Sequence, residues 1–578
     1  MSSILFTNDE LKKFNKIYKN LEANDEFEIM FGGFKKNNYI NLKQFTDLLK
    51  YFKDFSDENK LKINHNETLD ISYNYDNNNF HMYRITINSI DEINKLMKTL
   101  HNKPNQVIFS ILISMILNDK NENLSIINKK KNFENTYDLE EFDIRVRLSK
   151  EESLKKKELE DLLDLKNINK MSITFRKKSR ISLIIDSNSD VDFVLDLTKV
   201  KSGNDINKIN NLPYSYEFEL DFNKKKKLSA NKEKEYIEKL NKYILFCKKI
   251  LEQSNHIISS SEKKLVMSTY NKLLYGDENV ISKSLYGTSV VSLEALHIVE
   301  FLPNKYSITD KADGDRCLGI IIDRNLYLIF SNLEIKNSGV KLSTDKFNKS
   351  ILDGEYIFSK KYNKFIFALF DILYYAGENI RNEINLEIRY QKLNELVRDG
   401  FKFNFKFEKY SDKFNLDKIT NYYKDDLKKY LKFLMEELKK NKSDTFVCQK
   451  YFIFCLGGLD CEIFRYSNLM WDMYTSKNVD VPYVLDGLIY TPLRQIYTKV
   501  KKEQQFKNYK WKPPNKNSID FYVKIEKDEN GNAIDVFDDT KDNNIEGNTY
   551  KILNLYVGKM INNIEIPTLF RKEENLHI

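Results

Sequence analysis

The chain has 578 residues, too many for one hydrophobic core, and usual domain sizes predict roughly three to five structural units. Its 93 basic and 85 acidic residues leave a formal charge of +8, which allows a polyanionic partner without requiring one. The five cysteines form no CxxC pair and the six histidines lie apart from them, so neither a disulfide framework nor a zinc site is indicated.

The sequence starts without a signal peptide. Its longest apolar run, VIFSILISMIL at 107–117, is too short to span a membrane, so we expect it to form a buried helix. A soluble protein of a reducing intracellular compartment is expected, with no membrane partner.

Residues 1–225 have the pattern of a strand-rich domain. Period-two alternation occurs in EFEIMF, YRITI, FDIRVRL, ITFRKKSRISLII, FVLDLTKV and YEFELDF. A helix is predicted at 41–52 from the spacing of its apolar residues. These residues are Leu42, Phe45, Leu48, Leu49 and Phe52.

Two of these strands carry paired glutamates. Glu26 and Glu28 share one strand face, since side chains at i and i+2 point the same way, and Glu217 and Glu219 repeat the arrangement. If the two strands are close in one barrel, the four carboxylates form an oxygen-rich site suited to Mg²⁺ or Mn²⁺. The alternative is the solvated face of an ordinary antiparallel sheet.

Other strands carry positive charge on alternate residues, which would suit the binding of a metal-bound phosphate chain. These residues are Arg84, Arg145, Arg147, Arg176, Lys178 and Arg180.

The order EFEIMF, YRITI, DIRVRLSKE, FRKKSRISL, LDLTKVK, YEFELDF resembles the metal-dependent RNA triphosphatases of the triphosphate tunnel metalloenzyme family. The resemblance implies an eight-stranded tunnel barrel that acts on 5′-triphosphate RNA. It implies metal binding by Glu26, Glu28, Glu217 and Glu219. It also implies triphosphate binding by Arg84, Arg176, Arg180 and Lys201, with Glu151 and Asp196 orienting water or supporting the metal.

Residues 226–258 are predicted to be a helical connector, because 232–253 reads as an amphipathic helix. Residues 259–515 have a mixed α/β pattern. A long helix is expected at 416–440, with one apolar face. That face comprises Ile419, Tyr423, Leu427, Tyr430, Leu431 and Leu434.

The segment TDKADGDRCLGI at 309–320 contains a candidate nucleophile, Lys311. A lysine of ordinary pKa, about 10.4, is protonated at neutral pH and attacks only when burial or a nearby positive centre frees its lone pair. Asp-Gly is typical of a tight turn, which would leave Lys311 facing a cleft. One more solvated lysine is the alternative.

Four further segments follow Lys311. LDGEYI offers Glu355 just after a tight turn, and FALFDIL places Phe370 in an apolar strand. LDGLIYTP offers Asp486, and YKWKPP puts Lys510 and Lys512 on one strand face. A hairpin turn, a core aromatic ring and solvated lysines are the structural alternatives for these segments.

The collinear segments KADGDR, LDGEYI, FALFD, DGLIY and KWKPP resemble the covalent nucleotidyltransferases, namely mRNA guanylyltransferases and polynucleotide ligases. The resemblance implies that Lys311 attacks the α-phosphate of a nucleoside triphosphate to form a lysyl-nucleotide. The roles it implies elsewhere are ribose binding by Arg316 and Glu355, nucleotide binding by Asp313, base stacking on Phe370, metal binding by Asp486, and α-phosphate contact by Lys510 and Lys512.

A triphosphatase followed by a nucleotidyltransferase resembles the large subunit of poxvirus-type mRNA capping enzymes, which occur in large cytoplasmic DNA viruses and yeast cytoplasmic linear plasmids. HIVEFLPNKYSITDKADGDR at 297–316 is especially similar to that group. The resemblance implies hydrolysis of pppRNA to ppRNA, then GMP transfer from GTP to give GpppRNA. It implies action in the host cytoplasm or virion, with a methyltransferase subunit or an RNA polymerase as possible partners.

The expected fold is therefore α+β and multidomain: a tunnel barrel, a nucleotidyltransferase domain, and an incomplete OB-fold-like segment at 516–578. IDFYVKIEKDENGNAIDVF and YKILNLYVG are typical of opening OB strands, but no RxDK-like final motif follows residue 514. We expect no methyl transfer by this chain. The alternatives are an ATP-dependent polynucleotide ligase, a triphosphatase with a silent transferase half, and a non-catalytic RNA-binding scaffold.

Overall fold

The computed structural model describes most of the chain. Its residues are 8–23, 25–32, 40–75, 81–117, 123–154, 156–161, 171–303, 305–407, 410, 415–518, 520–529, 531, 533–537, 549–561 and 564–570. The chain divides into two compact units, 1–139 with 143–244 and 518–578, and 140–142 with 245–517. Each unit is described by itself.

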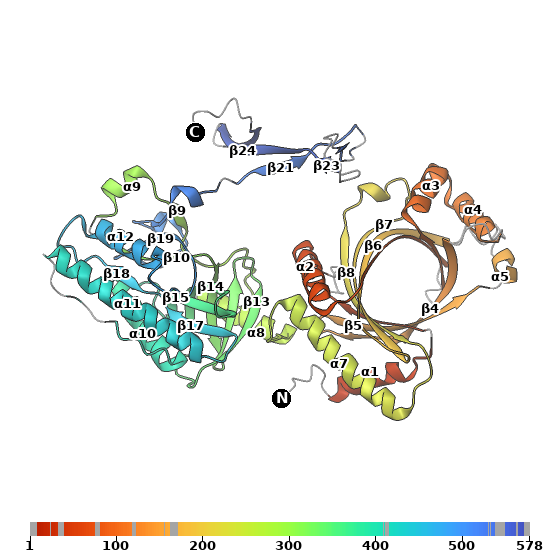
Figure 1. The fold of residues 1–578 in the computed structure, drawn as a ribbon, viewed down its shortest axis with the longest axis horizontal. Helices are drawn as coiled ribbons and strands as arrows, with labels where there is room; N and C mark the ends of the chain where they lie inside the picture. Colours follow the sequence, from red (N-terminus) through yellow and green to blue (C-terminus); the bar gives the residue numbers. More distant parts are fainter. Residues whose placement is uncertain are drawn as a thin grey trace. The chain divides into compact units, whose positions relative to one another are not determined.

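Eight antiparallel strands of the first unit close into a barrel, which Figure 1 shows as a ring. Around the ring the order is β1-β5-β4-β3-β2-β6-β7-β8. The predicted eight-stranded barrel is confirmed. The strands are β1 (Glu26–Phe31), β2 (Ile63–Tyr75), β3 (His81–Asn88), β4 (Leu124–Leu139), β5 (Ile144–Ser153), β6 (Met171–Ser187), β7 (Val191–Gly203) and β8 (Ser215–Lys224).

Helices cover the outside of this barrel, because the strands alternate apolar residues outward with polar or charged residues inward. Phe27 of β1 packs on Phe14, and Tyr73 of β2 packs on Phe109. Phe193 of β7 packs on Tyr243 of the long helix α7. The helices are α1 (Asn8–Lys19), α2 (Leu42–Asn59), α3 (Ile90–Leu100), α4 (Asn105–Leu117), α5 (Lys156–Asp161) and α7 (Ala230–Glu252), with a 3₁₀ turn at Ile209–Asn211.

Three predicted helices of this unit form, with one correction. α7 matches the helix expected at 232–253, and α4 contains the apolar run, whose Ile108 and Phe109 are fully buried. In α2, Leu42 and Leu49 are exposed rather than part of the apolar face. Of the helices in the described ranges, none is long and apolar enough to cross a membrane.

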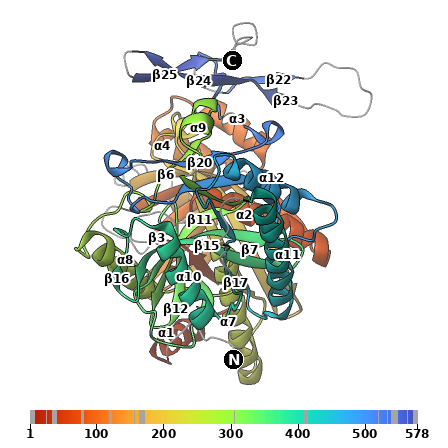
Figure 2. The same ribbon diagram turned by 90° about the vertical axis from the view of Figure 1, so that its left-hand side faces the viewer.

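The second unit contains two sheets with helices packed on them (Figure 2). One sheet has the order β18-β10-β19-β20-β9. The other has the order β13-β12-β11-β14-β15-β16, and β17 pairs parallel to β15. The strands are β9 (Val290–Ser292), β10 (Tyr306–Ala312), β11 (Asp315–Ile322), β12 (Asn325–Phe330), β13 (Ile335–Lys341), β14 (Ile351–Ser359), β15 (Lys364–Tyr375), β16 (Glu378–Asn379), β17 (Thr445–Gln449), β18 (Phe452–Phe454), β19 (Leu485–Pro492) and β20 (Asn508–Trp511).

The predicted helix at 416–440 is confirmed as α11, and its expected apolar face is buried in the main core of this unit. α10 packs against β15 and β17, and α12 packs against α11 and β10. The helices of this unit are α8 (Ser260–Tyr275), α9 (Ala295–Glu300), α10 (Leu386–Phe401), α11 (Leu416–Lys440) and α12 (Glu462–Thr475), with 3₁₀ turns at Lys501–Glu503 and Pro514–Lys516.

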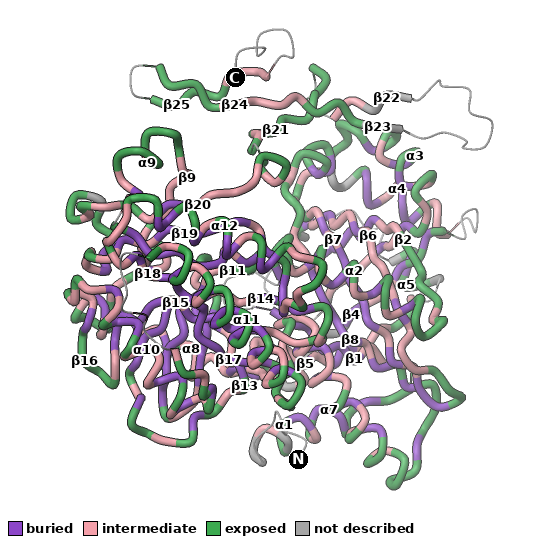
Figure 3. The backbone as a smooth tube through the Cα atoms, turned by 60° about the vertical axis from the view of Figure 1, so that its left-hand side comes forward, coloured by how far each residue is buried: buried purple, intermediate pink, exposed green. Residues whose placement is uncertain are grey.

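The last segment forms a three-stranded sheet, β21-β24-β25, and a two-stranded sheet, β22-β23. Residues of β21 and β25 are largely exposed (Figure 3), and Asp520 is exposed before them. Within the part that the structure describes, these strands form open sheets rather than a closed barrel. The strands are β21 (Tyr522–Ile525), β22 (Asp535–Phe537), β23 (Thr549–Lys551), β24 (Leu553–Ile561) and β25 (Ile564–Leu569).

Candidate active sites

The two strands with paired glutamates lie side by side in the barrel. β1 and β8 pair antiparallel, with Glu28 opposite Asp221 and Met30 opposite Glu219. Phe27 and Phe222, on the other strand faces, pack against each other outside the barrel. The four glutamates therefore face the barrel interior together.

Each of these glutamates contacts a basic side chain from another strand. Lys129 of β4 donates to Glu26, and Arg147 of β5 lies 3.4 Å from Glu28. Arg176 of β6 lies 2.6 Å from Glu217, and Arg180 lies 3.7 Å from Glu219. The barrel interior is thus lined by paired acidic and basic side chains, and it is not the solvated face of an open sheet.

Two further predicted acidic residues of the barrel also form ion pairs in its interior. Glu151 of β5 binds Arg84 of β3 at 2.7 Å and Lys129 at 3.3 Å. Asp196 of β7 binds Arg180 at 2.9 Å. The structure thus gathers the predicted glutamates, Glu151, Asp196 and three predicted arginines in one lumen.

Carboxylates crowd together where β1, β8 and β7 meet. Burial, followed by the negative charge of Glu26, raises the pKa of Glu28 to about 8. Burial and Glu217 raise the pKa of Glu219, and burial with Asp196 and Glu219 raises that of Asp221 well above its usual range. Burial and the neighbouring carboxylates thus favour the protonated form of these side chains when no cation is bound.

This donor set fits a hard divalent cation in its chemistry, because it offers several buried carboxyl oxygens close together. In the described ranges no group of three or more His, Cys, Asp or Glu side chains is already arranged around a metal position. The glutamates point instead to the lysine and arginines of the lumen, so metal binding would require them to exchange those partners.

Lys201 is the exception among the predicted barrel residues. Lys201 lies an even number of residues from Leu195 and Leu197 along β7, so it is on the same strand face as they are. Asp196 is on the opposite face. Its amine donates to the carbonyl of Asn210 and lies 4.6 Å from the ring centre of Tyr214. The structure therefore places Lys201 on the outer face, away from the lumen.

A cavity of about 160 Å³ in the second unit gathers most of the other predicted residues. Lys311 comes from β10, Arg316 from β11, Glu355 from β14, Phe370 from β15 and Lys510 from β20. Strands from both sheets therefore contribute to one site.

Lys311 and Lys512 share one carboxylate. Asp486 on β19 accepts a hydrogen bond from Lys311 and lies 2.8 Å from the amine of Lys512. Gly487, next to Asp486, has φ +157° and lies where a Cβ atom would collide with the carbonyl oxygen of Trp511. The glycine thus allows β19 and β20 to approach closely enough for this three-residue contact.

The side chain of Arg316 is held from several directions. It donates to both carboxylate oxygens of Asp353, at 3.1 and 2.6 Å, and to the carbonyl of Thr288 at 2.6 Å. Tyr497 also donates to Asp353. The guanidinium lies 5.7 Å from the ring centre of Phe370, so both residues are fixed at the cavity wall before any ligand enters.

Glu355 lies in the middle of β14, not after a tight turn, because Leu352, Asp353 and Gly354 continue the same strand. Its partner is Lys450, which is buried, lies 2.6 Å from Glu355 and lies 3.2 Å from Asp310. Burial raises the pKa of Glu355, and Lys450 partly opposes this effect.

Asp486 and Lys512 do not line this cavity but are joined to Lys311 by the shared carboxylate. Asp313 does not line it either. It is exposed in the turn between β10 and β11, as expected for the Asp-Gly pair. Sequence reasoning assigned no role to a further set of charged and polar site residues, some of which lie within the quoted segments. They are Asp70, Lys129 and Asp221 in the barrel, and Asp310, Asp353, Lys450 and Tyr497 in the second unit.

Residues 247–445 match the family model of the mRNA capping enzyme catalytic domain. Over 584 aligned residues, the chain is 29% identical to a probable mRNA-capping enzyme of Acanthamoeba polyphaga mimivirus, covering 98% of this chain and 46% of that protein. The chain is similar to viral mRNA-capping enzymes. The chain spans about half the length of this mimivirus protein.

Further matches are shorter or less similar in sequence. An African swine fever virus mRNA-capping enzyme is 33% identical over 107 residues, or 18% of this chain and 11% of that protein. A solved RNA triphosphatase domain of a mimivirus mRNA capping enzyme is 22% identical, with TM-score 0.35, covering 43% of this chain and 98% of that one.

Proposed function

We propose that this chain caps mRNA in two steps. Residues 1–225 remove the γ-phosphate from a 5′-triphosphate RNA, and residues 259–515 transfer GMP from GTP to the resulting diphosphate end. The observation that supports this most strongly is the position of Lys311 beside Asp486 and Lys512, at a cavity in the part of the chain that matches the capping enzyme catalytic domain.

In the transferase step, Nζ of Lys311 attacks the α-phosphorus of GTP. A P–N bond forms and the bond to pyrophosphate breaks, and an oxygen of the RNA β-phosphate then displaces the lysine. Asp486 orients the amine, and Lys510 and Lys512 offset charge on the phosphate. Phe370 stacks on the base, while Arg316 and Glu355 contact the ribose.

In the hydrolysis step, the arginines of the barrel lumen bind the triphosphate. Arg84 projects from β3, while Arg176 and Arg180 project from β6, with β2 between these two strands. They exchange their carboxylate partners for phosphate oxygens. Glu151 and Asp196 orient the attacking water.

Mg²⁺ or Mn²⁺ would be held by Glu26, Glu28, Glu217 and Glu219 in the barrel, and by Asp486 in the second unit. When bound, a divalent cation neutralises charge on the phosphates. Action in a host cytoplasm, and partnership with a methyltransferase subunit or an RNA polymerase, stay predictions from the resemblance.

Label transfer tests the transferase half. The full chain is incubated with Mg²⁺ and α-labelled GTP or ATP, denatured, and examined for covalently bound label. We expect label from GTP alone, and none in Lys311→Ala. Lys361→Ala is the matched control, because Lys361 also pairs with an aspartate, Asp480, but is half-exposed and outside the cavity.

Two outcomes would contradict this assignment. Label from ATP alone would favour a polynucleotide ligase. An absence of label from both nucleotides, together with phosphate release from triphosphate RNA, would leave a triphosphatase with a silent transferase half.

A further inference from the structure

A second cavity of about 380 Å³ lies in the second unit, larger than the one that contains Lys311. α10 and α11 contribute Glu387, Tyr390 and Asp426 to its lining. Tyr451, Phe454 and Arg494 come from the β17–β18 connection, β18 and the segment after β19. The capping chemistry proposed above does not use this cavity.

The two cavities share a wall. Phe452 on β18 lines both of them, and the adjoining Lys450 lines the cavity that contains Lys311. Tyr390 donates at 2.9 Å to the carbonyl of Lys450. In the register of β10 and β18, Thr309 lies opposite Phe452, so Lys311 follows on the same face two residues later.

Aromatic rings form much of the wall of the second cavity. Tyr390 contacts Phe407, Phe452 and Phe454 edge to face, with ring centres 5.3–5.4 Å apart. Phe452 and Phe454 are nearly parallel, 5.8 Å apart. Such a surface suits a planar aromatic ligand that can stack on a ring face.

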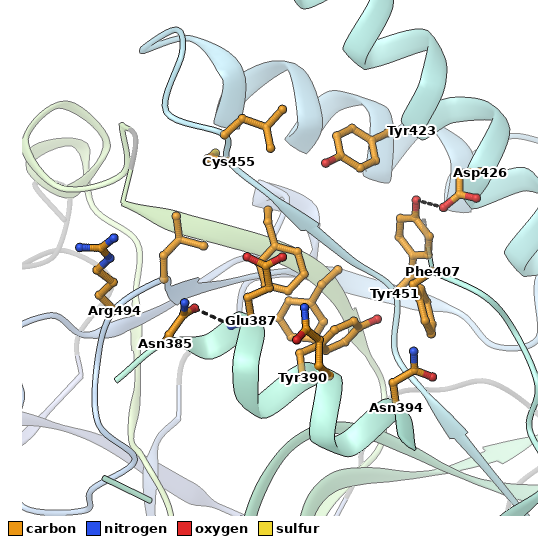
Figure 4. Close-up of a pocket in the computed structure, with 15 residues that line it drawn as sticks. Asn385, Glu387, Tyr390, Asn394, Phe407, Tyr423, Asp426, Tyr451, Cys455 and Arg494 are labelled. Atoms are coloured by element: carbon orange, nitrogen blue, oxygen red, sulfur yellow. Dashed lines mark hydrogen bonds between the residues drawn. The ribbon is translucent and has the colours of Figure 1, made fainter. Parts of the chain in front are cut away.

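Charged groups lie at three positions around these rings (Figure 4). The carboxylate of Glu387 points into the middle of the cavity, Asp426 lies at one side with Tyr451 donating to it at 2.6 Å, and Arg494 lies at the other side. Arg494 is exposed. The interior therefore offers hydrogen-bond acceptors, and the cationic group is at the solvent side.

We propose that this cavity binds the first base of the acceptor RNA and so positions its 5′ diphosphate beside the lysyl-nucleotide. Carboxylates would repel a phosphate, whereas they accept hydrogen bonds from ring N–H and amino groups of a base. The aromatic wall stacks on the base, and Arg494 meets the backbone phosphate. The inference rests on the proposed function, since the shared Phe452 makes the base a neighbour of the reacting lysine.

The test uses the full chain and two 5′-diphosphate RNA octamers, one starting with guanosine and one with an abasic ribose. Their affinities are measured by fluorescence anisotropy. The wild-type chain should bind the guanosine octamer about fivefold or more tightly, from roughly 1–3 kcal/mol per stacked base. Glu387→Gln should reduce this ratio and leave the affinity for the abasic octamer unchanged.

Gln391→Trp provides a second variant, because Gln391 lines the same cavity and is exposed, so a larger side chain there fills space without replacing a core residue. Glu395→Gln is the matched control on α10, since Glu395 pairs with Lys346 and does not line the cavity. The control should keep the wild-type ratio.

Lysyl-GMP formation without RNA separates the two proposals. It should be unchanged in Glu387→Gln and Gln391→Trp, while GMP transfer to the guanosine octamer falls. Equal binding of both octamers by the wild-type chain, or a wild-type ratio in both variants, would overturn the base-binding proposal. A wild-type chain that forms no lysyl-GMP would instead count against the proposed function.

Discussion

Asp486 lies between Lys311 and Lys512, accepting a hydrogen bond from the first and lying 2.8 Å from the amine of the second. One carboxylate thus positions both the proposed nucleophile and a proposed phosphate contact. Their mutual arrangement depends on Gly487, which has no side chain to separate β19 from β20.

Asp486→Asn should lower lysyl-GMP formation about 100-fold, because the neutral amide neither orients the charged amines nor binds metal as well. The rate of label transfer from α-labelled GTP checks this. Asp480→Asn removes the partner of exposed Lys361 and serves as the control. An equal rate in Asp486→Asn and Asp480→Asn would contradict the role.

Gly487→Ala should destabilise the second unit by more than Gly457→Ala does. At Gly457, with φ +76°, nothing lies within 4 Å, so alanine costs only the left-handed backbone, roughly 1–2 kcal/mol. At Gly487 the clash with Trp511 adds to a similar strain. Denaturant unfolding followed by tryptophan fluorescence measures this, since both tryptophans, Trp471 and Trp511, lie in this unit and contact each other. Equal midpoints for the two variants would contradict it.

Lys450→Met should destabilise the same unit by about 3–5 kcal/mol, because it leaves Asp310 and Glu355 without their buried cation. Denaturant unfolding monitored by tryptophan fluorescence measures the free energy. The double variant Lys450→Met/Glu355→Gln should recover part of the loss, since one uncompensated charge is gone. A double variant less stable than the single one would argue against this charge balance.

Glu28→Gln should abolish most phosphate release from triphosphate RNA and leave lysyl-GMP formation intact, because Glu28 lies in the barrel and Lys311 in the other unit. A loss of about 100-fold or more is expected for a metal-binding or transition-state contact. Glu67→Gln is the control, because Glu67 is on the same outward face of β2 as Leu69, two residues later. Full phosphate release by Glu28→Gln would remove Glu28 from the proposed site.

Chelation of divalent cations should stop phosphate release and label transfer together. Both should return when Mg²⁺ or Mn²⁺ is restored in excess of the chelator, while the tryptophan fluorescence stays at its folded value throughout. Phosphate release that persists at high chelator concentration would contradict a metal site made by the barrel glutamates.

Local pattern was enough for much of the fold. Alternation in EFEIMF and YEFELDF predicted strands with glutamates on one face, and helical spacing predicted α7 and α11. These features depend on neighbours two to four positions away, which the sequence displays directly. The same reasoning failed for Leu42 and Leu49, whose exposure depends on what the rest of the chain places beside α2.

What the sequence by itself determined is the identity and order of the reactive groups: paired glutamates on two strands, and a lysine followed by collinear acidic and basic segments. Only the tertiary structure decided their partners. Lys129, Asp70 and Lys450 carry no motif, yet each is buried in an ion pair contributed by distant strands. Lys201 and Asp313 have suitable chemistry but lie outside the sites. The physical reason is that the charge balance of a buried site is set by side chains that contact one another across a barrel or between sheets. Those contacts cannot be read from the spacing of residues along the sequence.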